Sequence, residues 1–212
     1  MGPTISITRR AAAAAAALLL GGCGPPKGVT PAASSAVHQP PALSPRKLSD
    51  VFVLEAAGVE PDDTVVTVPA GVSRVVVLRR SAPDFGLFAR LNFPDGVLTG
   101  AAETGGRGGA GTDATAARLT IRPTPGLYGL ELELEGSVGD GATIVFSYGA
   151  HFVAPAGARQ RFGNDIAFER QLAIGRMTGD TLVVFLPTSR PGSDMLSAPL
   201  PGPGRYLVAA PR

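Results

Sequence analysis

The chain has 212 residues, a formal net charge of +2, 28 glycines, 20 prolines and a single cysteine. One cysteine cannot form an internal disulfide, which excludes the class of small secreted domains that disulfides hold together. Apolar residues make up 44% of the chain, which excludes a protein that is disordered throughout. The isoelectric point of about 9.0 is typical of proteins that bind nucleic acids or other anionic surfaces.

The first 22 residues have the composition of a signal peptide. Arg9 and Arg10 supply positive charge, and an apolar stretch of ten residues follows at 11–20. A permanent membrane helix needs about 20 apolar residues, so this stretch is too short to be one. It has the length of the apolar region of a signal peptide, which is removed from the mature protein.

The residues Leu20-Gly21-Gly22-Cys23 place the only cysteine directly after this apolar region. The segment resembles the lipobox of bacterial lipoprotein signal peptides. The resemblance implies cleavage between Gly22 and Cys23, a diacylglycerol joined to the Cys23 sulfur by a thioether, and acylation of the new amine. A thiolate is a strong nucleophile and suits this modification. Because two or more chains anchor a protein stably, we expect Cys23 to hold it to the cell membrane or the outer membrane.

Two export routes remain open. Thr8-Arg9-Arg10 is similar to part of a twin-arginine export signal. That signal usually carries a bulky apolar residue two places after the second arginine, where this chain has Ala12. The same two arginines also suit the general secretory route.

Residues 23–49 are expected to form a tether. Residues 24–49 contain six prolines and no aromatic residue, so burial cannot offset the entropy of ordering them. A flexible coil of this length spans about 28 Å, and a fully extended polyproline helix about 80 Å. His38 lies in this segment and is interpreted as a solvated side chain.

Residues 50–212 are predicted to form one all-β domain, an antiparallel β-sandwich (Ig-like or similar) of about 8–9 strands. Apolar residues alternate with polar ones or form short runs, which is typical of strands. The clearest strand is 130–135, Leu-Glu-Leu-Glu-Leu-Glu, which predicts one buried and one solvated face. Other expected strands include 118–122, 142–153 and 166–177, and turn sequences separate them. Residues 160–172 are the nearest candidate for a helix.

Residues 99–117 are rich in glycine, alanine and threonine and predict a long flexible loop. Within it, Gly106–Gly111 satisfies the Gly-x-Gly-x-x-Gly pattern. A dinucleotide site needs a helix after this pattern, and here a strand is expected instead. We interpret the segment as a glycine-rich loop and predict no cofactor.

Catalytic and metal-binding patterns are weak. His151 is the one histidine after the tether, and the sequence places it inside a strand, without the partners of a nucleophilic triad. One histidine without a free cysteine cannot supply a zinc site. Aspartates cluster in predicted turns, where their side chains bond to the local backbone; these are Asp62, Asp63, Asp95, Asp113, Asp140, Asp165 and Asp180. We therefore predict neither a catalytic residue nor a metal site.

A basic stretch contains Arg159, Arg161, Arg170 and Arg176 around two phenylalanines. It favours either contact with anionic lipid or polysaccharide, or an ordinary soluble surface. Removing residues 1–22 leaves 17 basic and 17 acidic side chains, so the basicity belongs to the signal peptide. A nucleic-acid partner is therefore not expected.

These observations predict an exported, lipid-anchored protein of the bacterial envelope. The domain is expected to be a non-catalytic interaction or structural module on a membrane surface. Its partners would be membrane lipid through Cys23 and an envelope protein or polysaccharide. Two alternatives remain: an envelope hydrolase that uses loop carboxylates, and a polysaccharide-binding module.

Overall fold

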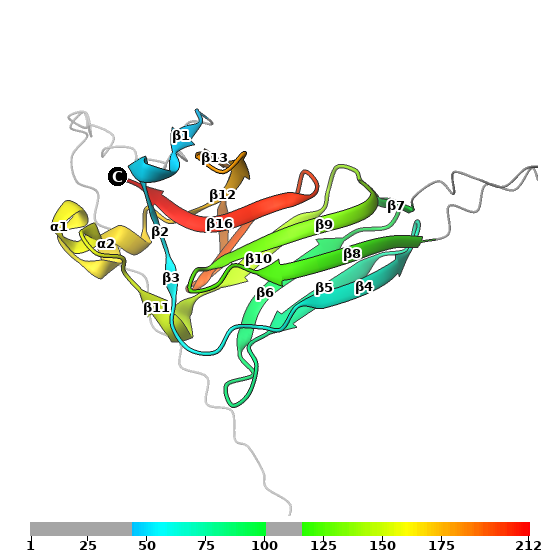
Figure 1. The fold of residues 1–212 in the computed structure, drawn as a ribbon, viewed down its shortest axis with the longest axis horizontal. Coiled ribbons are helices and arrows are strands. Elements are labelled where there is room, and N and C mark those ends of the chain that lie inside the picture. The colour runs from blue at the N-terminus through cyan, green and yellow to red at the C-terminus, as the bar shows by residue number, and fades with distance from the viewer. Residues whose placement is uncertain (1–43, 101–115) are drawn as a thin grey trace, which may run out of the picture. The chain divides into compact units, whose positions relative to one another are not determined.

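The computed structural model describes residues 44–100 and 116–212. These residues form an antiparallel all-β sandwich, as the sequence predicts (Figure 1). They contain two short helices and 16 strands rather than the predicted 8–9, because many strands are only two to five residues long. Residues 23–43 of the predicted tether, which include Cys23, and residues 101–115 of the predicted loop lie outside the described residues. Residues 46–47 of the tether, and 99–100 and 116–117 of the loop, belong to strands, because each pairs with a neighbouring strand. Among residues 44–100 and 116–212, no helix is long and apolar enough to span a bilayer.

The larger sheet has nine strands. Its main order is β1-β13-β12-β16-β9-β8-β4, while β2 also pairs with β16 and β7 with β9. The strands are β1 (Arg46–Lys47), β2 (Val51–Val53), β4 (Thr64–Pro69), β7 (Leu98–Gly100), β8 (Ala116–Pro123), β9 (Gly129–Val138), β12 (Ala173–Thr178), β13 (Leu182–Phe185) and β16 (Gly204–Pro211).

The smaller sheet has five strands in the order β14-β15-β10-β6-β5. They are β5 (Arg74–Arg79), β6 (Leu87–Phe93), β10 (Thr143–Ser147), β14 (Ser189–Gly192) and β15 (Met195–Pro199). A third, two-stranded sheet joins β3 (Glu55–Ala56) to β11 (Phe152–Val153). The helices are α1 (Ala158–Phe162) and α2 (Asp165–Glu169), with 3₁₀ turns at Leu48–Asp50 and Gly149–His151.

The main core is built by alternating side chains of the two sheets. On β9, Leu130 and Leu132 are buried while Glu133 and Glu135 are exposed, which confirms the predicted two-faced strand. Strands of the smaller sheet contribute apolar side chains to the same core, among them Leu91, Ile144, Phe146 and Leu196. On β16, alternation sends Tyr206 and Val208 to this core and Leu207 and Ala209 to a second apolar cluster on the opposite face.

The structure corrects two predicted strands. The strand predicted at 142–153 ends at Ser147, because Tyr148 adopts helical backbone angles and a 3₁₀ turn follows. The strand predicted at 166–177 begins instead as α2, where the Asn164 side chain accepts a hydrogen bond from the Ala167 amide and caps the helix. Only its second part forms β12. The expected helix near 160–172 is thus a pair of short helices.

Candidate functional site

The most connected polar cluster ties together three segments that lie far apart in the sequence: residues 57–60, the loop from Arg80 to Gly86, and the turn around His151. Arg80 directly follows β5. Val76 and Leu78 on that strand point into the core, so the period of two carries Arg80 to the buried side as well. Only 2% of Arg80 is exposed, and it is the one charged residue fully buried in the described part of the chain.

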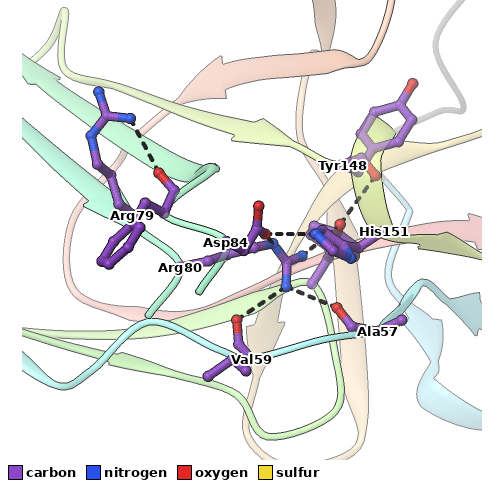
Figure 2. Close-up of polar contacts among 9 residues, drawn as sticks. Ala57, Val59, Arg79, Arg80, Asp84, Tyr148 and His151 are labelled. Atoms are coloured by element: carbon purple, nitrogen blue, oxygen red, sulfur yellow. Dashed lines mark hydrogen bonds and ion pairs between the residues drawn. The ribbon is translucent and has the colours of Figure 1, made fainter. Parts of the chain in front are cut away.

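The Arg80 guanidinium is hydrogen-bonded at both terminal nitrogens (Figure 2). Nη1 donates to the carbonyls of Ala57 at 2.9 Å and Val59 at 3.3 Å, and Nη2 donates to the Tyr128 hydroxyl at 2.7 Å. The guanidinium carbon of Arg80, Cζ, lies 5.3 Å from the ring centroids of both Phe88 and Tyr128, which is within the range of a cation–π contact. A buried charge is tolerated when it is paired and hydrogen-bonded in this way.

Asp84 links Arg80 to His151. One carboxylate oxygen lies 2.6 Å from His151 Nε2 and 3.6 Å from Arg80 Nε (Figure 2). A carboxylate that orients an imidazole is part of many catalytic sites, but the other ring nitrogen must then reach a nucleophile. Here Nδ1 faces Gly58, where an added Cβ would lie 3.1 Å from it. In the described residues, no hydroxyl or thiol is hydrogen-bonded to His151, and its contact with Asp84 joins the 3₁₀ turn at Gly149–His151 to the loop that follows β5.

A second polar cluster lies next to the first. The Tyr128 hydroxyl donates to the Tyr148 carbonyl at 3.0 Å, and the Tyr148 hydroxyl donates to Glu169 Oε1 at 2.9 Å. Arg190 donates to the Tyr148 hydroxyl at 2.9 Å and to the Glu169 carbonyl at 2.6 Å. Burial raises the pKa of Tyr148, and the hydrogen bond to Glu169 raises it further, so the phenol stays a donor. This cluster fastens α2 to β14.

Three of the sequence-predicted aspartates in the described part of the chain make side-chain contacts, and none of these contacts is with the local backbone: Asp63 Oδ2 lies 3.8 Å from Arg122 Nε, and Asp95 and Asp165 accept hydrogen bonds. Asp95 accepts a hydrogen bond from the Ser73 amide at 2.7 Å. Asp165 forms a two-point ion pair with Arg159, at 2.6 and 2.5 Å. Asp113 lies outside the described residues. Over the ranges 44–100 and 116–212, no group of three or more histidine, cysteine, aspartate or glutamate side chains is arranged to hold a metal ion.

The predicted basic stretch does not form one surface. Arg159 is neutralised by Asp165, and Arg176 belongs to β12, where it donates to the Pro203 carbonyl at 2.7 Å. Arg161 and Arg170 remain exposed on the helical pair. Two glutamates of β9 lie opposite arginines of β8, Glu131 opposite Arg122 and Glu135 opposite Arg118. Glu133, between them, forms an ion pair with Arg122.

No family model, curated protein sequence or solved structure matches this chain. A proposal about function therefore depends on the chain's own residues.

The sequence pattern contains a signal for the burial of Arg80 that the sequence analysis did not use: Val76, Leu78 and Arg80 fall on one face of a strand. The Asp84–His151 contact had no such signal, because 67 residues separate its partners.

Proposed function

We propose that this protein is a lipoprotein of the bacterial envelope, exported and anchored through Cys23, whose β-sandwich is a non-catalytic interaction or structural module at a membrane surface. The observation that carries the proposal is the position of the only cysteine, at the end of Leu20-Gly21-Gly22-Cys23. The positive charge of Arg9 and Arg10, the short apolar stretch at 11–20 and the proline-rich tether give independent support.

The geometry of the domain supports a module that acts by its surface. The two polar clusters consist of side chains that are bonded to one another and to backbone carbonyls, and they fix the loops at one end of the sandwich. A rigid scaffold with fixed loops is well suited to present a binding surface.

Metabolic labelling with an alkyne analogue of palmitate tests the anchor. The wild-type chain should be labelled, and Cys23→Ser should lose the label because it lacks the sulfur that accepts the lipid. Ser34→Ala, a change in the same tether, is the matched control and should be labelled like the wild type. Equal labelling of Cys23→Ser would refute the proposal.

Membrane fractionation supplies a second readout. The wild type should sediment with membranes and resist extraction by high salt, because acyl chains rather than charges hold it. Cys23→Ser should keep residues 1–22, since cleavage requires the lipidated cysteine in the lipobox pattern, and intact-mass measurement would detect them. A Cys23→Ser protein that is cleaved and bound to membranes like the wild type would contradict the lipoprotein assignment.

A further inference from the structure

The helical pair α1–α2 has one face in the core and another that is solvated. Phe168 is fully buried, and its ring centroid lies 5.7 Å from that of Phe162 and 6.2 Å from that of Phe52 on β2. The opposite face presents Ile166, which is 63% exposed, the highest value among the large apolar side chains described. A lone isoleucine on the outside of a helix needs no explanation by itself, so its neighbours decide what it can do.

Two exposed arginines belong to the same helical pair as Ile166. Arg170 lies four residues further on, at the position that shares its side of the helix, and is exposed. Arg161 on α1 is also exposed, with its guanidinium 5.7 Å from the Phe162 ring. Neither arginine makes an ion pair within the described residues. Among the nearby acids, Asp165 pairs with Arg159, and Glu169 accepts the Tyr148 hydroxyl.

This face also lies close to where the tether joins the domain. The helices pack on Phe52, six residues after the first strand begins at Arg46, and Figure 1 shows β2 and the helical pair at the same end of the domain. Residues 24–45, which separate Cys23 from Arg46, number 22. Even fully extended, 22 residues reach at most about 75 Å, so a lipid on Cys23 keeps this end of the domain within that distance of the membrane.

We infer that the face formed by Arg161, Ile166 and Arg170 rests on an anionic phospholipid bilayer, with the arginines on lipid phosphates and Ile166 in the interface. The inference rests on the proposed lipid anchor. Basic side chains are attracted to anionic leaflets, and an apolar side chain between them gains free energy by leaving water. The contact orients the domain on the membrane that its tether already holds near.

A fluorescent label at position 166 tests this contact. In the lipidated protein Cys23 carries lipid on its sulfur, so Ile166→Cys introduces the one free thiol and can be labelled with a nitrobenzoxadiazole dye. The lipidated full-length protein is reconstituted into neutral phosphatidylcholine vesicles or into vesicles that also contain phosphatidylglycerol. We expect a blue-shifted, brighter emission with the anionic vesicles alone, and loss of the shift at high salt, where charges are screened.

Matched variants separate the face from the rest of the surface. Arg161→Gln with Arg170→Gln should weaken the contact about 25-fold, from roughly fivefold for each arginine near an anionic surface. Arg74→Gln with Arg118→Gln removes the same charge from exposed positions on β5 and β8 and should leave the emission unchanged. In Figure 1, β8 begins at the opposite end of the domain from the helices.

The outcomes distinguish the two proposals. If Cys23 is not lipidated, the protein will not float with the neutral vesicles and Cys23 will itself take the dye, which refutes the anchor. If the protein floats but the emission is the same with neutral and anionic vesicles, the proposed membrane contact of Arg161, Ile166 and Arg170 is refuted and the lipid anchor on Cys23 is supported. A shift caused by a soluble acidic polysaccharide and not by anionic vesicles would also overturn the membrane contact and indicate a glycan partner.

Discussion

Replacing Arg80 by methionine tests whether the buried arginine stabilises the fold. Methionine retains most of the volume but removes the charge and the hydrogen bonds. The bond to Tyr128 is buried and worth about 2 kcal/mol, whereas the carbonyls of Ala57 and Val59 belong to exposed residues and regain water. Stacking on Phe88 and Tyr128 adds about 1 kcal/mol.

Asp84 adds little to this cost, because it is 28% exposed and can be hydrated once its partner is gone. We therefore expect Arg80→Met to lower the free energy of unfolding by about 3 kcal/mol. That is a large part of the roughly 5–15 kcal/mol of a typical domain. For a domain of this size the melting temperature should fall by roughly 6–12 °C.

Urea unfolding followed by circular dichroism measures the change, with the free energy taken from linear extrapolation. Arg79→Met is the matched control: Arg79 is exposed and donates one hydrogen bond, to the Phe85 carbonyl at 3.3 Å. We expect that control to stay within about 0.5 kcal/mol of the wild type. If Arg80→Met were equally mild, the arginine would not stabilise the fold and the reasoning from its bonded, buried position would be refuted.

Two further predictions concern alkaline pH and glycine. Burial raises the pKa of Tyr128, Tyr148 and Tyr206 from 10.0, so above pH 10 the folded chain keeps phenol protons that the unfolded chain releases. The free energy of unfolding should therefore be constant below about pH 9 and fall above pH 10, by up to about 4 kcal/mol per pH unit for the three tyrosines together. Tyrosinate absorbance should therefore appear together with loss of circular dichroism, and its appearance in the folded protein near pH 10 would contradict this. Gly136 has φ +133°, and a Cβ added there would collide with the Thr99 carbonyl oxygen, whereas a Cβ added at Gly139 would lie 3.5 Å from its nearest atom. In urea unfolding, Gly136→Ala should therefore lower the free energy of unfolding by more than about 2 kcal/mol, and the control Gly139→Ala by less than about 1 kcal/mol. If the two variants lowered the free energy of unfolding equally, the close approach of the Thr99 carbonyl would not be the reason that position 136 requires glycine.

The parts of the fold that sequence reasoning predicted are those whose signal lies within one strand. The alternation at 130–135 is visible in six consecutive residues, and the structure has it as part of β9. The turn at Thr178-Gly179-Asp180 also has a local cause, because glycine readily adopts the φ of +61° that Gly179 has between β12 and β13.

Other parts could not be predicted because their causes are not local. The hairpin of β14 and β15 contains Pro191, Gly192 and Pro199, which hide the strand pattern, and it forms because β10 offers a partner edge. Ile166 belongs to a residue type favoured in strands, yet the cap at Asn164 and packing of Phe168 on Phe52 decide for a helix.

The candidate site divides in the same way. The proposal for Cys23 rests on a contiguous motif, so the sequence alone is enough to make it. The cluster around Arg80, by contrast, depends on three segments that only the folded sandwich brings together, so no spacing in the sequence indicates it.

The place of β16 in the larger sheet affects the order in which the domain can form. This strand pairs with β2, β9 and β12, and Val53 of β2 lies opposite Ala209. A chain synthesised from its N-terminus therefore carries three strands without their shared neighbour until residues 204–211 have emerged. Such open strand edges readily pair with other chains. Until then the nascent protein needs protection from aggregation, and any truncation before residue 204 would make that exposed state permanent.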